Sequence, residues 1–411
     1  MVPEPGTAPP AADREADRLR ANLPKLSLLG ASHMFLVVMP VIVPFYRAHD
    51  LSLRDIYVLQ AIFSVSTLLL EVPSGYAADL LGRKRSLVLG SVFYGASFSV
   101  LAAADGFAGF AVFEVLAAIG VAFFSGTDVA LLYASLRGAS EPSRAGGRAI
   151  GRLVFASQLG ETAAAVLGGV LAGVSLHLPV TVNAFTAWVP LLVSLTLHEP
   201  AGERLSRAHH GENVRAVARV LFGQGRRLRL LFVNQVWLGA ATLLAVWALQ
   251  PYWTEQGVPL QLFGWLWAAQ NLAVALTARA AHRVEGAIGF PAVVAVAGLL
   301  TLVGALGMGF GGGVAGIALG LAFPVCRGLN QVVLRNDMNA RVPEPMRATA
   351  NSVVALGMRL VFAGAGPLLG WSMDRFGAAA ALRLAAIAFA VLVLSTTVPL
   401  ARATRTEAVN A

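Results

Sequence analysis

The sequence predicts an all-α membrane protein with twelve transmembrane helices. The first observation is composition: among 411 residues, 57% are hydrophobic and 13% are charged, and the mean hydropathy is +0.69. A soluble globular chain is far less apolar. The second observation is that apolar stretches of about 20 residues, each long enough to cross a bilayer, recur twelve times. The third is that basic residues gather on alternate connections between these stretches.

The apolar stretches form two sets of six. Those of the first set lie near residues 27–46, 56–74, 86–104, 107–131, 150–171 and 179–197. Those of the second set lie near residues 230–252, 260–281, 287–308, 313–333, 352–371 and 378–400. We therefore expect a six-helix half over 27–198, a cytoplasmic linker over 199–229 and a second half over 230–400. The remaining residues, 1–26 and 401–411, are expected to be cytoplasmic tails, the first disordered because it is polar and proline-bearing.

The basic residues also orient the chain. If the N-terminus is inside, 25 of the 31 Lys and Arg residues lie in the tails, the linker and the inner connections, and only four lie in outer loops. This asymmetry predicts that both termini are cytoplasmic. It also accounts for the net charge of +9 without a nucleic-acid partner. Only 2 of the 31 bases are lysine, and Ala, Gly and Arg are abundant, which is typical of a bacterial inner-membrane protein.

The linker contains one amphipathic segment. Val214, Val217, Ala218 and Leu221 follow the i, i+3, i+4, i+7 spacing of one helical face, and Arg215 and Arg219 lie off that face. We expect a helix that lies on the membrane surface and binds anionic lipid headgroups. A docking helix for a partner is the alternative.

An internal repeat supports the division into halves. The segment Glu141-Pro142-Ser143-Arg144-Ala145 recurs as Glu344-Pro345-Met346-Arg347-Ala348, before the fifth and the eleventh stretch. Within these two stretches, residues 164–168 match residues 366–370 in nearly the same register. Duplicated six-helix halves are typical of secondary transporters.

A short basic connection follows the second stretch. Its spaced residues are Gly75, Asp79, Gly82, Arg83 and Lys84. This Gly-x-x-x-Asp-x-x-Gly-Arg-Lys pattern resembles the signature loop between helices 2 and 3 of the major facilitator superfamily of secondary transporters, although Leu80 replaces the usual basic residue. The resemblance implies alternating access, in which two six-helix halves rock about a central site. We expect residues 75–85 to form a tight turn, with Asp79 as a latch at the start of helix 11.

Two further family motifs are altered. Where many proton-coupled members carry Arg-x-x-Gln-Gly in helix 4, this chain has Glu114-Val115-Leu116-Ala117-Ala118. Helix 5 has small residues where drug/proton antiporters carry Gly-x-x-x-Gly-Pro-x-x-Gly-Gly, namely Gly160, Ala164, Ala165, Gly168 and Gly169. Small residues allow close helix packing. The resemblance to antiporters favours export.

Ionisable residues within the apolar stretches indicate where a wet cavity lies, because a charge facing lipid is costly. They are Glu71, Glu114, Asp128, Glu161, Arg327 and Arg359. Stretches 3, 6 and 9 have none, and stretch 12 has only Arg383 near one end, so these four are expected to face lipid. Asn and Gln side chains extend the expected substrate cavity: Gln158, Asn234, Gln235, Gln270, Asn271, Asn330 and Gln331.

Counting helical rise places Glu161 near the midplane and predicts it as the proton-coupling residue, with Gln158 one turn away as a hydrogen-bond partner. Glu114 is a second candidate for proton coupling. The same counting places Glu71, Asp128, Arg327 and Arg359 in the inner third. We expect an inner gate in which Asp128 pairs with Arg327 and Glu71 pairs with Arg359. Snorkelling to the membrane surface is the alternative for these charges.

Three functions fit these observations. The first is a proton-coupled exporter of a small amphipathic metabolite or drug. The second is a carrier of small organic anions, bound by Arg327 and Arg359. The third is a membrane sensor or scaffold without transport. The sequence has one cysteine, Cys326, and no metal-ligand cluster, phosphate-binding loop or nucleophile motif, so no enzyme activity and no cofactor are expected. We expect a monomer whose partners are a small-molecule substrate and membrane lipid.

Overall fold

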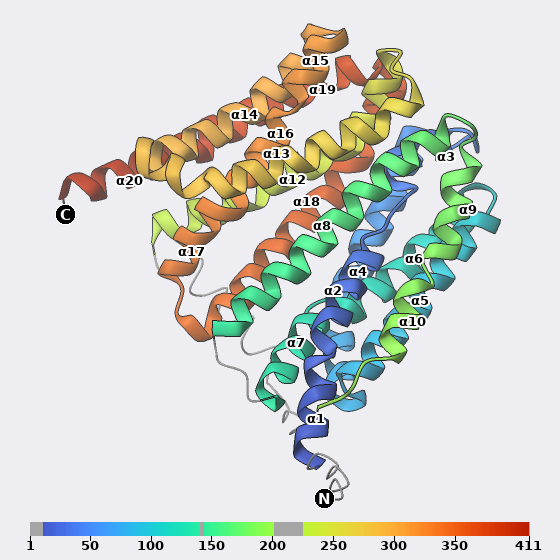
Figure 1. Ribbon diagram of the computed structural model, residues 1–411. Coiled ribbons are helices and arrows are strands. Elements are labelled where there is room, and N and C mark those ends of the chain that lie inside the picture. The colour runs from blue at the N-terminus through green and yellow to red at the C-terminus, as the bar shows by residue number, and fades with distance from the viewer. Residues whose placement is uncertain (1–10, 140–143, 201–224, 411) are drawn as a thin grey trace, which may run out of the picture.

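The computed structural model describes residues 11–139, 144–200 and 225–410, and every regular element in these ranges is a helix (Figure 1). The first half comprises α1 (Ala11–Arg20), α2 (Asn22–His33), the 3₁₀ helix η1 (Met39–Val41), α3 (Ile42–Arg47), α4 (Leu53–Leu81), α5 (Arg83–Ala103), α6 (Gly106–Phe124), α7 (Thr127–Gly138), α8 (Arg144–Ala172), α9 (His177–Thr186) and α10 (Val189–Leu195).

The second half begins after the linker. It comprises α12 (Arg226–Glu255), α13 (Leu260–Ile288), α14 (Phe290–Gly311), α15 (Gly313–Gly320), α16 (Ala322–Leu329), the π-helix η2 (Asn330–Leu334), α17 (Arg335–Arg341), the 3₁₀ helix η3 (Glu344–Met346), α18 (Arg347–Phe376), α19 (Ala378–Leu392), the π-helix η4 (Val393–Thr397) and α20 (Val398–Asn410). The repeated segments occupy equivalent positions, since Arg144 and Arg347 are the first residues of α8 and α18.

Ten helical segments of the described chain are long and apolar enough to cross a membrane. The expected stretches near 27–46 and 260–281 are not among the ten. The first is interrupted between His33 and Met39, so neither of its pieces is long enough. The second is α13, which has the length but carries polar residues such as Gln270 and Asn271.

Two sequence predictions need correction. Residues 11–26 are helical rather than disordered: Leu19 is buried, and the Asn22 amide donates to Ser135 Oγ at 2.9 Å. The expected tail over 401–411 continues the last helix, because α20 extends to Asn410, and its cytoplasmic location stays a prediction. Residues 75–81 belong to α4, so the turn contains only Gly82, at φ 91°. The amphipathic linker segment at 214–221 lies outside the described residues.

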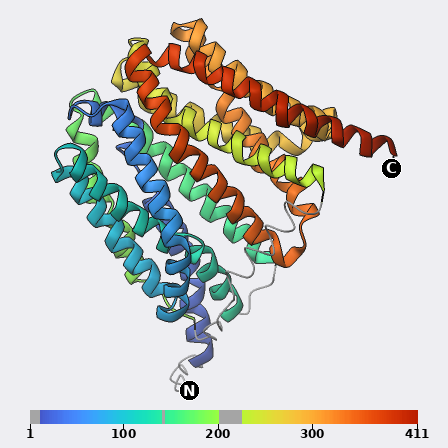
Figure 2. The same ribbon diagram turned by 180° about the vertical axis from the view of Figure 1, so that it is seen from behind.

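The two halves meet along two pairs of helices. In Figures 1 and 2, α18 runs beside α4, and α13 runs beside α8; the contacts between these elements agree. α1 and α20 lie at one end of the bundle, which we call the terminal end; the turns after Arg47 and Phe376 lie at the other, the opposite end (Figure 1). The halves diverge toward the terminal end (Figure 2).

Polar contacts between the halves lie at the opposite end or midway along the helices. Gln250 of α12 joins α3 and η1: its Oε1 accepts from Val43 N at 3.0 Å, and its Nε2 donates to Met39 O at 2.8 Å. Tyr57 Oη donates to Leu244 O at 2.9 Å. The protein is therefore closed at the opposite end.

Small residues of α8 allow these close contacts. A side chain at Gly160 or Gly168 would meet the backbone of Ala31 or Val37, at the interrupted first segment. On the other side of α8, a Cβ at Gly169 would lie 2.8 Å from Gly264 N and 2.9 Å from Gln261 O of α13. The predicted role of the small residues in close packing is confirmed.

Replacing Gly169 with Val should therefore push α8 and α13 apart. Overpacking of this kind costs about 1–3 kcal/mol, so we expect a lower melting temperature for the purified protein. Gly151→Val is the matched control, because Gly151 lies on the same helix and its Cβ would meet nothing within 4 Å. Equal melting temperatures for the two variants would contradict this account of the interface.

Candidate functional site

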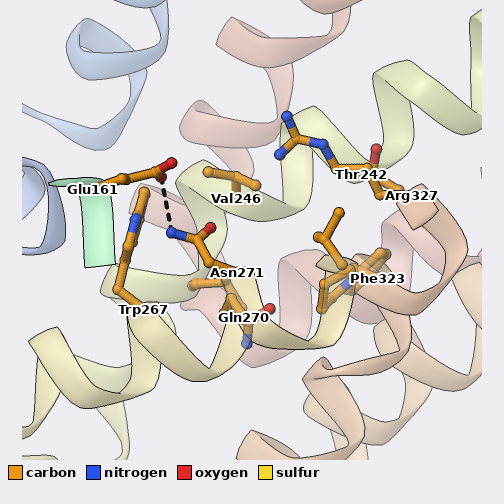
Figure 3. Close-up of a pocket in the computed structure, with 11 residues that line it drawn as sticks. Glu161, Thr242, Val246, Trp267, Gln270, Asn271, Phe323 and Arg327 are labelled. Carbon is orange, nitrogen blue, oxygen red and sulfur yellow. Dashed lines mark hydrogen bonds between the residues drawn. The ribbon is translucent and has the colours of Figure 1, made fainter. Parts of the chain in front are cut away.

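A cavity lies between the halves, midway along the helices (Figure 3). Its volume is about 70 Å³, room for roughly five water molecules at about 10–15 Å³ each. α8 contributes one residue to its wall and the second half contributes the rest. The lining residues are Glu161, Thr242, Val246, Leu249, Trp267, Gln270, Asn271, Val274, Phe323, Pro324 and Arg327. None of them belongs to α5, α9, α10, α14 or α19, the helices expected to face lipid.

Glu161 makes a hydrogen bond across the interface between the halves, inside this cavity. Its Oε1 accepts a hydrogen bond from Asn271 Nδ2 at 2.8 Å (Figure 3). The predicted partner Gln158 is exposed and does not line the cavity. The hydrogen-bond partner of Glu161 therefore comes from the second half rather than from its own helix.

Arg327 lines the same cavity. Its side chain reaches into the cavity that Glu161 lines, and Glu161 is the acid that acts on it electrostatically. The Asp128 carboxylate accepts from Val129 N at 2.7 Å. Counting helical rise locates only the Cα atom, and a long arginine side chain extends well beyond it. The pairing of Arg327 with Asp128 and the inner-third position of both residues stay predictions.

Glu71 and Arg359 lie on α4 and α18, which pack together across the interface. Glu71 is the acid that acts electrostatically on Arg359. Glu71 is exposed and Arg359 is half-buried. The described residues contain no ion pair at contact distance between them, and their pairing as a gate stays a prediction.

The other predicted amides divide into four groups. Gln270 and Asn271 line the cavity. Asn234 is fully buried inside the second half, where its side chain bonds to Leu230 O at 2.7 Å and to Thr397 Oγ1 at 2.6 Å, so it does not line the cavity. Gln235 and Asn330 contact each other, since Asn330 Nδ2 donates to Gln235 O at 3.2 Å. Gln331, the last of the set, is exposed.

Glu114 lies outside the cavity, enclosed in the first half. It is 3% exposed and accepts hydrogen bonds from Tyr46 Oη at 3.1 Å and from Gln60 Nε2 at 2.5 Å. These three residues come from α6, α3 and α4. Any proton that reaches Glu114 must pass through packed side chains.

One acid that closes the opposite end was not among the predicted site residues. The Asp374 carboxylate, near the end of α18, accepts from Leu53 N and Arg54 N at the start of α4, both at 2.9 Å. A carboxylate there satisfies free N–H groups and favours the helix dipole. The signal was present: Gly370, Asp374 and Gly377 have the spacing of Gly75, Asp79 and Gly82.

A second acid that the sequence predictions did not include binds the signature connection from outside it. Glu199 binds the start of α5 after the Gly82 turn, accepting from Arg83 N at 3.0 Å and Lys84 N at 2.6 Å. The side chain of Asp79 lies outside the described residues, so its role as a latch stays a prediction.

A bundle of membrane-spanning helices in two packed halves, with a polar cavity between them, defines a membrane transporter rather than an enzyme. The family model of the Major Facilitator Superfamily matches residues 26–364. The chain belongs to this superfamily. No curated protein sequence matches the chain.

Solved structures share the fold. The nucleoside transporter NupG is similar with a TM-score of 0.74 and 13% identity, covering 93% of this chain and 98% of that chain. A bacterial homolog of the human lysosomal transporter Spinster, inward-facing and unoccupied, has a TM-score of 0.71 and 16% identity, with 98% of each chain covered. A D-xylose-proton symporter has a TM-score of 0.62 and 14% identity, covering 92% of this chain and 97% of that chain. Sequence identities this low show that these proteins share a fold with this chain, and they do not show a shared substrate.

Replacing Asp374 with Asn should weaken the closed end. Loss of a helix-capping side chain costs about 0.5–2 kcal/mol, so the opposite end should open more often. We would place a cysteine at Leu249 in the cavity, in a Cys326→Ser background, and measure its labelling by an impermeant maleimide added from the opposite end. Labelling should be about two- to thirtyfold faster in the Asp374→Asn variant.

Asp55→Asn is the matched control for this prediction. Asp55 accepts from Ser52 N at the start of the same helix, α4, but makes that contact within the first half. Its loss should destabilise α4 without raising access from the opposite end. If both variants label equally fast, Asp374 does not hold the halves together.

Proposed function

We propose that this chain is a proton-coupled secondary transporter that works by alternating access, with twelve transmembrane helices and both termini in the cytoplasm. The basic residues of the tails and inner connections support this orientation. In this orientation the closed, opposite end faces outward and the divergent, terminal end faces the cytoplasm. The conformation is then inward-facing, with the cavity at the point where the halves separate.

The observation that carries the proposal is the bond between Glu161 and Asn271. It joins the two halves inside the cavity, at 2.8 Å, beside the cationic Arg327. A charged carboxylate is a stronger acceptor than a neutral carboxyl and also attracts the arginine. Protonation of Glu161 therefore weakens its hold on the second half, and this links proton binding to the relative motion of the halves.

The cavity wall suits a small amphipathic solute. Trp267 and Phe323 supply flat apolar surfaces, and Gln270 and Asn271 supply hydrogen bonds, which is the usual composition of a small-molecule site. We propose export as the direction because the small residues of α8 resemble those of drug/proton antiporters. The energy source is the proton gradient, without a cofactor, and the chain acts as a monomer in the bacterial inner membrane.

A second candidate is a carrier of small organic anions. Arg327 lines the cavity, so a carboxylate or phosphate could bind it there, while Arg359 on α18 lies outside the set of lining residues. An arginine offers two parallel hydrogen bonds to such a group. A sensor or scaffold without transport is the third candidate and predicts no flux.

Replacing Glu161 with Gln removes the titrating group but keeps a hydrogen-bonding side chain. In proteoliposomes with an imposed pH gradient, screened against a compound panel, we expect uphill transport to disappear while counterflow exchange continues. Glu114→Gln is the comparison, because Glu114 is enclosed in the first half. Loss of uphill transport in Glu114→Gln, with Glu161→Gln unaffected, would move the coupling site to Glu114.

Arg327→Gln separates the first two candidates. If the substrate is an anion held by the arginine, its apparent affinity should fall at least tenfold, since hydrogen bonds to charged groups contribute about 1.5–3 kcal/mol. An amphipathic neutral or cationic substrate should lose less than threefold in affinity. The measurement is the concentration for half-maximal exchange in the same proteoliposomes. Absence of any flux across the panel would favour the sensor or scaffold.

A further inference from the structure

Two buried amides on the cytoplasmic side of the cavity have polar atoms without partners. Gln235 of α12 is 4% exposed and Asn330 of η2 is 9% exposed. Within the described chain, Gln235 Nε2 and Asn330 Oδ1 have no hydrogen-bond partner. One atom is a donor and the other an acceptor. Buried polar groups are almost always satisfied, so an unpaired donor and acceptor need an explanation.

The two amides lie next to each other. Asn330 Nδ2 donates to Gln235 O at 3.2 Å, which also fixes which atom of the Asn330 amide is oxygen. Gly239 stands one turn further along α12, and a Cβ there would lie 2.8 Å from Met358 Sδ and 3.7 Å from Asn330 Nδ2. The place is therefore narrow, bounded by α12, η2 and α18.

The amide pair continues the wall of the central cavity. On α12, Gln235 and Gly239 share a helical face with the lining residue Thr242, at spacings of four and seven residues. On the facing segment, Asn330 follows the lining residue Arg327 by three residues, about one turn. Both helices thus lead from the cavity to the same pair.

The backbone at Asn330 is also unusual. Residues 330–334 form the π-helix η2, between the α-helical segments α16 and α17. Single π-helical turns are rare and frequently occur at functional sites, because they redirect the side chains that follow. This feature is independent of the unpaired atoms and lies at the same residue.

The neighbouring amide, Asn234, is an example of a buried amide whose hydrogen bonds are all made within the protein. Asn234 precedes Gln235 on α12 and is fully buried, and both of its side-chain polar atoms are bonded. The second half therefore has the means to satisfy buried amides. It does not do so for Gln235 Nε2 and Asn330 Oδ1.

We propose that Gln235 and Asn330 form a subsite that recognises a planar amide edge of the substrate, as found in carboxamides, lactams and cyclic imides. Such an edge presents a carbonyl acceptor beside an N–H donor, matching the Gln235 donor and the Asn330 acceptor. An aromatic or aliphatic body attached to it extends toward Phe323 and Trp267 in the cavity. This inference rests on the proposed function and names the substrate class of the same site.

A matched pair of compounds tests the subsite. Nicotinamide carries a carboxamide, and 3-acetylpyridine differs from it by a methyl group in place of the NH₂. We would titrate each into the purified full-length chain in nanodiscs and measure binding by calorimetry. Nicotinamide should bind about five- to tenfold more tightly, the effect of one or two neutral hydrogen bonds. Equal binding, or no binding of nicotinamide, overturns the proposal and leaves water as the occupant.

Substitutions of the two amides test whether the preference for nicotinamide depends on these residues. In Asn330→Leu the preference for nicotinamide should fall to about one, because Asn330 Oδ1 is the acceptor for the NH₂ group that 3-acetylpyridine lacks. Gln235→Met should weaken both compounds by a similar factor, because both carry the carbonyl that Gln235 Nε2 would bind. Asn336→Leu, which changes an exposed amide of α17, should keep the preference. A preference that survives in Asn330→Leu, or a Gln235→Met variant that binds both compounds as tightly as the unchanged protein, overturns the assignment to these residues. If a variant does not fold, the comparison of the two compounds on the unchanged protein still decides.

The proteoliposome assay separates this proposal from the proposed function. Selective nicotinamide binding that depends on Gln235 and Asn330 supports the subsite even if no compound is transported. Gradient-driven transport of compounds that lack an amide edge, with equal binding of the matched pair, overturns the subsite and leaves the transport function standing.

Discussion

The two halves of this protein are held together by hydrogen bonds at one end and at the middle, and this asymmetry organises the rest of the structure. Gln250, Tyr57 and Asp374 join the halves at the opposite end. Glu161 and Asn271 join them midway. Beyond that point the described halves diverge (Figure 2). The cavity lies where this last polar contact between the halves is made, and Glu161 and Asn271 belong to its lining.

Carboxylates at helix starts recur through the bundle. Glu199 binds the start of α5, Asp374 the start of α4, and Glu255 the start of α19 with a 2.6 Å bond from Ala378 N. The first N–H groups of a helix have no partner within the helix, and a nearby carboxylate both accepts from them and interacts favourably with the helix dipole. The contact of Asp374 is the one of these three that crosses between the halves. This helix-capping contact therefore also helps to hold the two halves together at the opposite end.

α4 and α18 share a sequence pattern at their C-terminal ends. Each ends with Gly-x-x-x-Asp-x-x-Gly, and the two helices pack against each other across the interface. The acid near the end of α18 reaches the start of α4 at the opposite end. The corresponding acid of α4, Asp79, occupies the equivalent position at the terminal end. The internal repeat thus places equivalent acids at both ends of a single helix pair.

Much of the fold could be predicted because hydrophobic length and basic residues are local properties of the sequence. The apolar stretches, the repeat before α8 and α18, and the close packing at Gly169 needed no tertiary information. The prediction of secondary structure was wrong in two places. Residues 11–26, expected to be disordered, are helical, because Leu19 and Asn22 contact the bundle. The signature residues 75–81 stay helical up to Gly82.

The sequence by itself determined that this is a helical membrane protein of the major facilitator type, and it identified most of the polar residues that matter. Only the tertiary structure decided their partners. Glu161 bonds to Asn271 rather than to Gln158, and Arg327 lines the same cavity. The reason is physical: depth along a helix follows from residue count, whereas pairing depends on rotation, tilt and side-chain reach across two halves. Those quantities are set by packing between helices far apart in the chain.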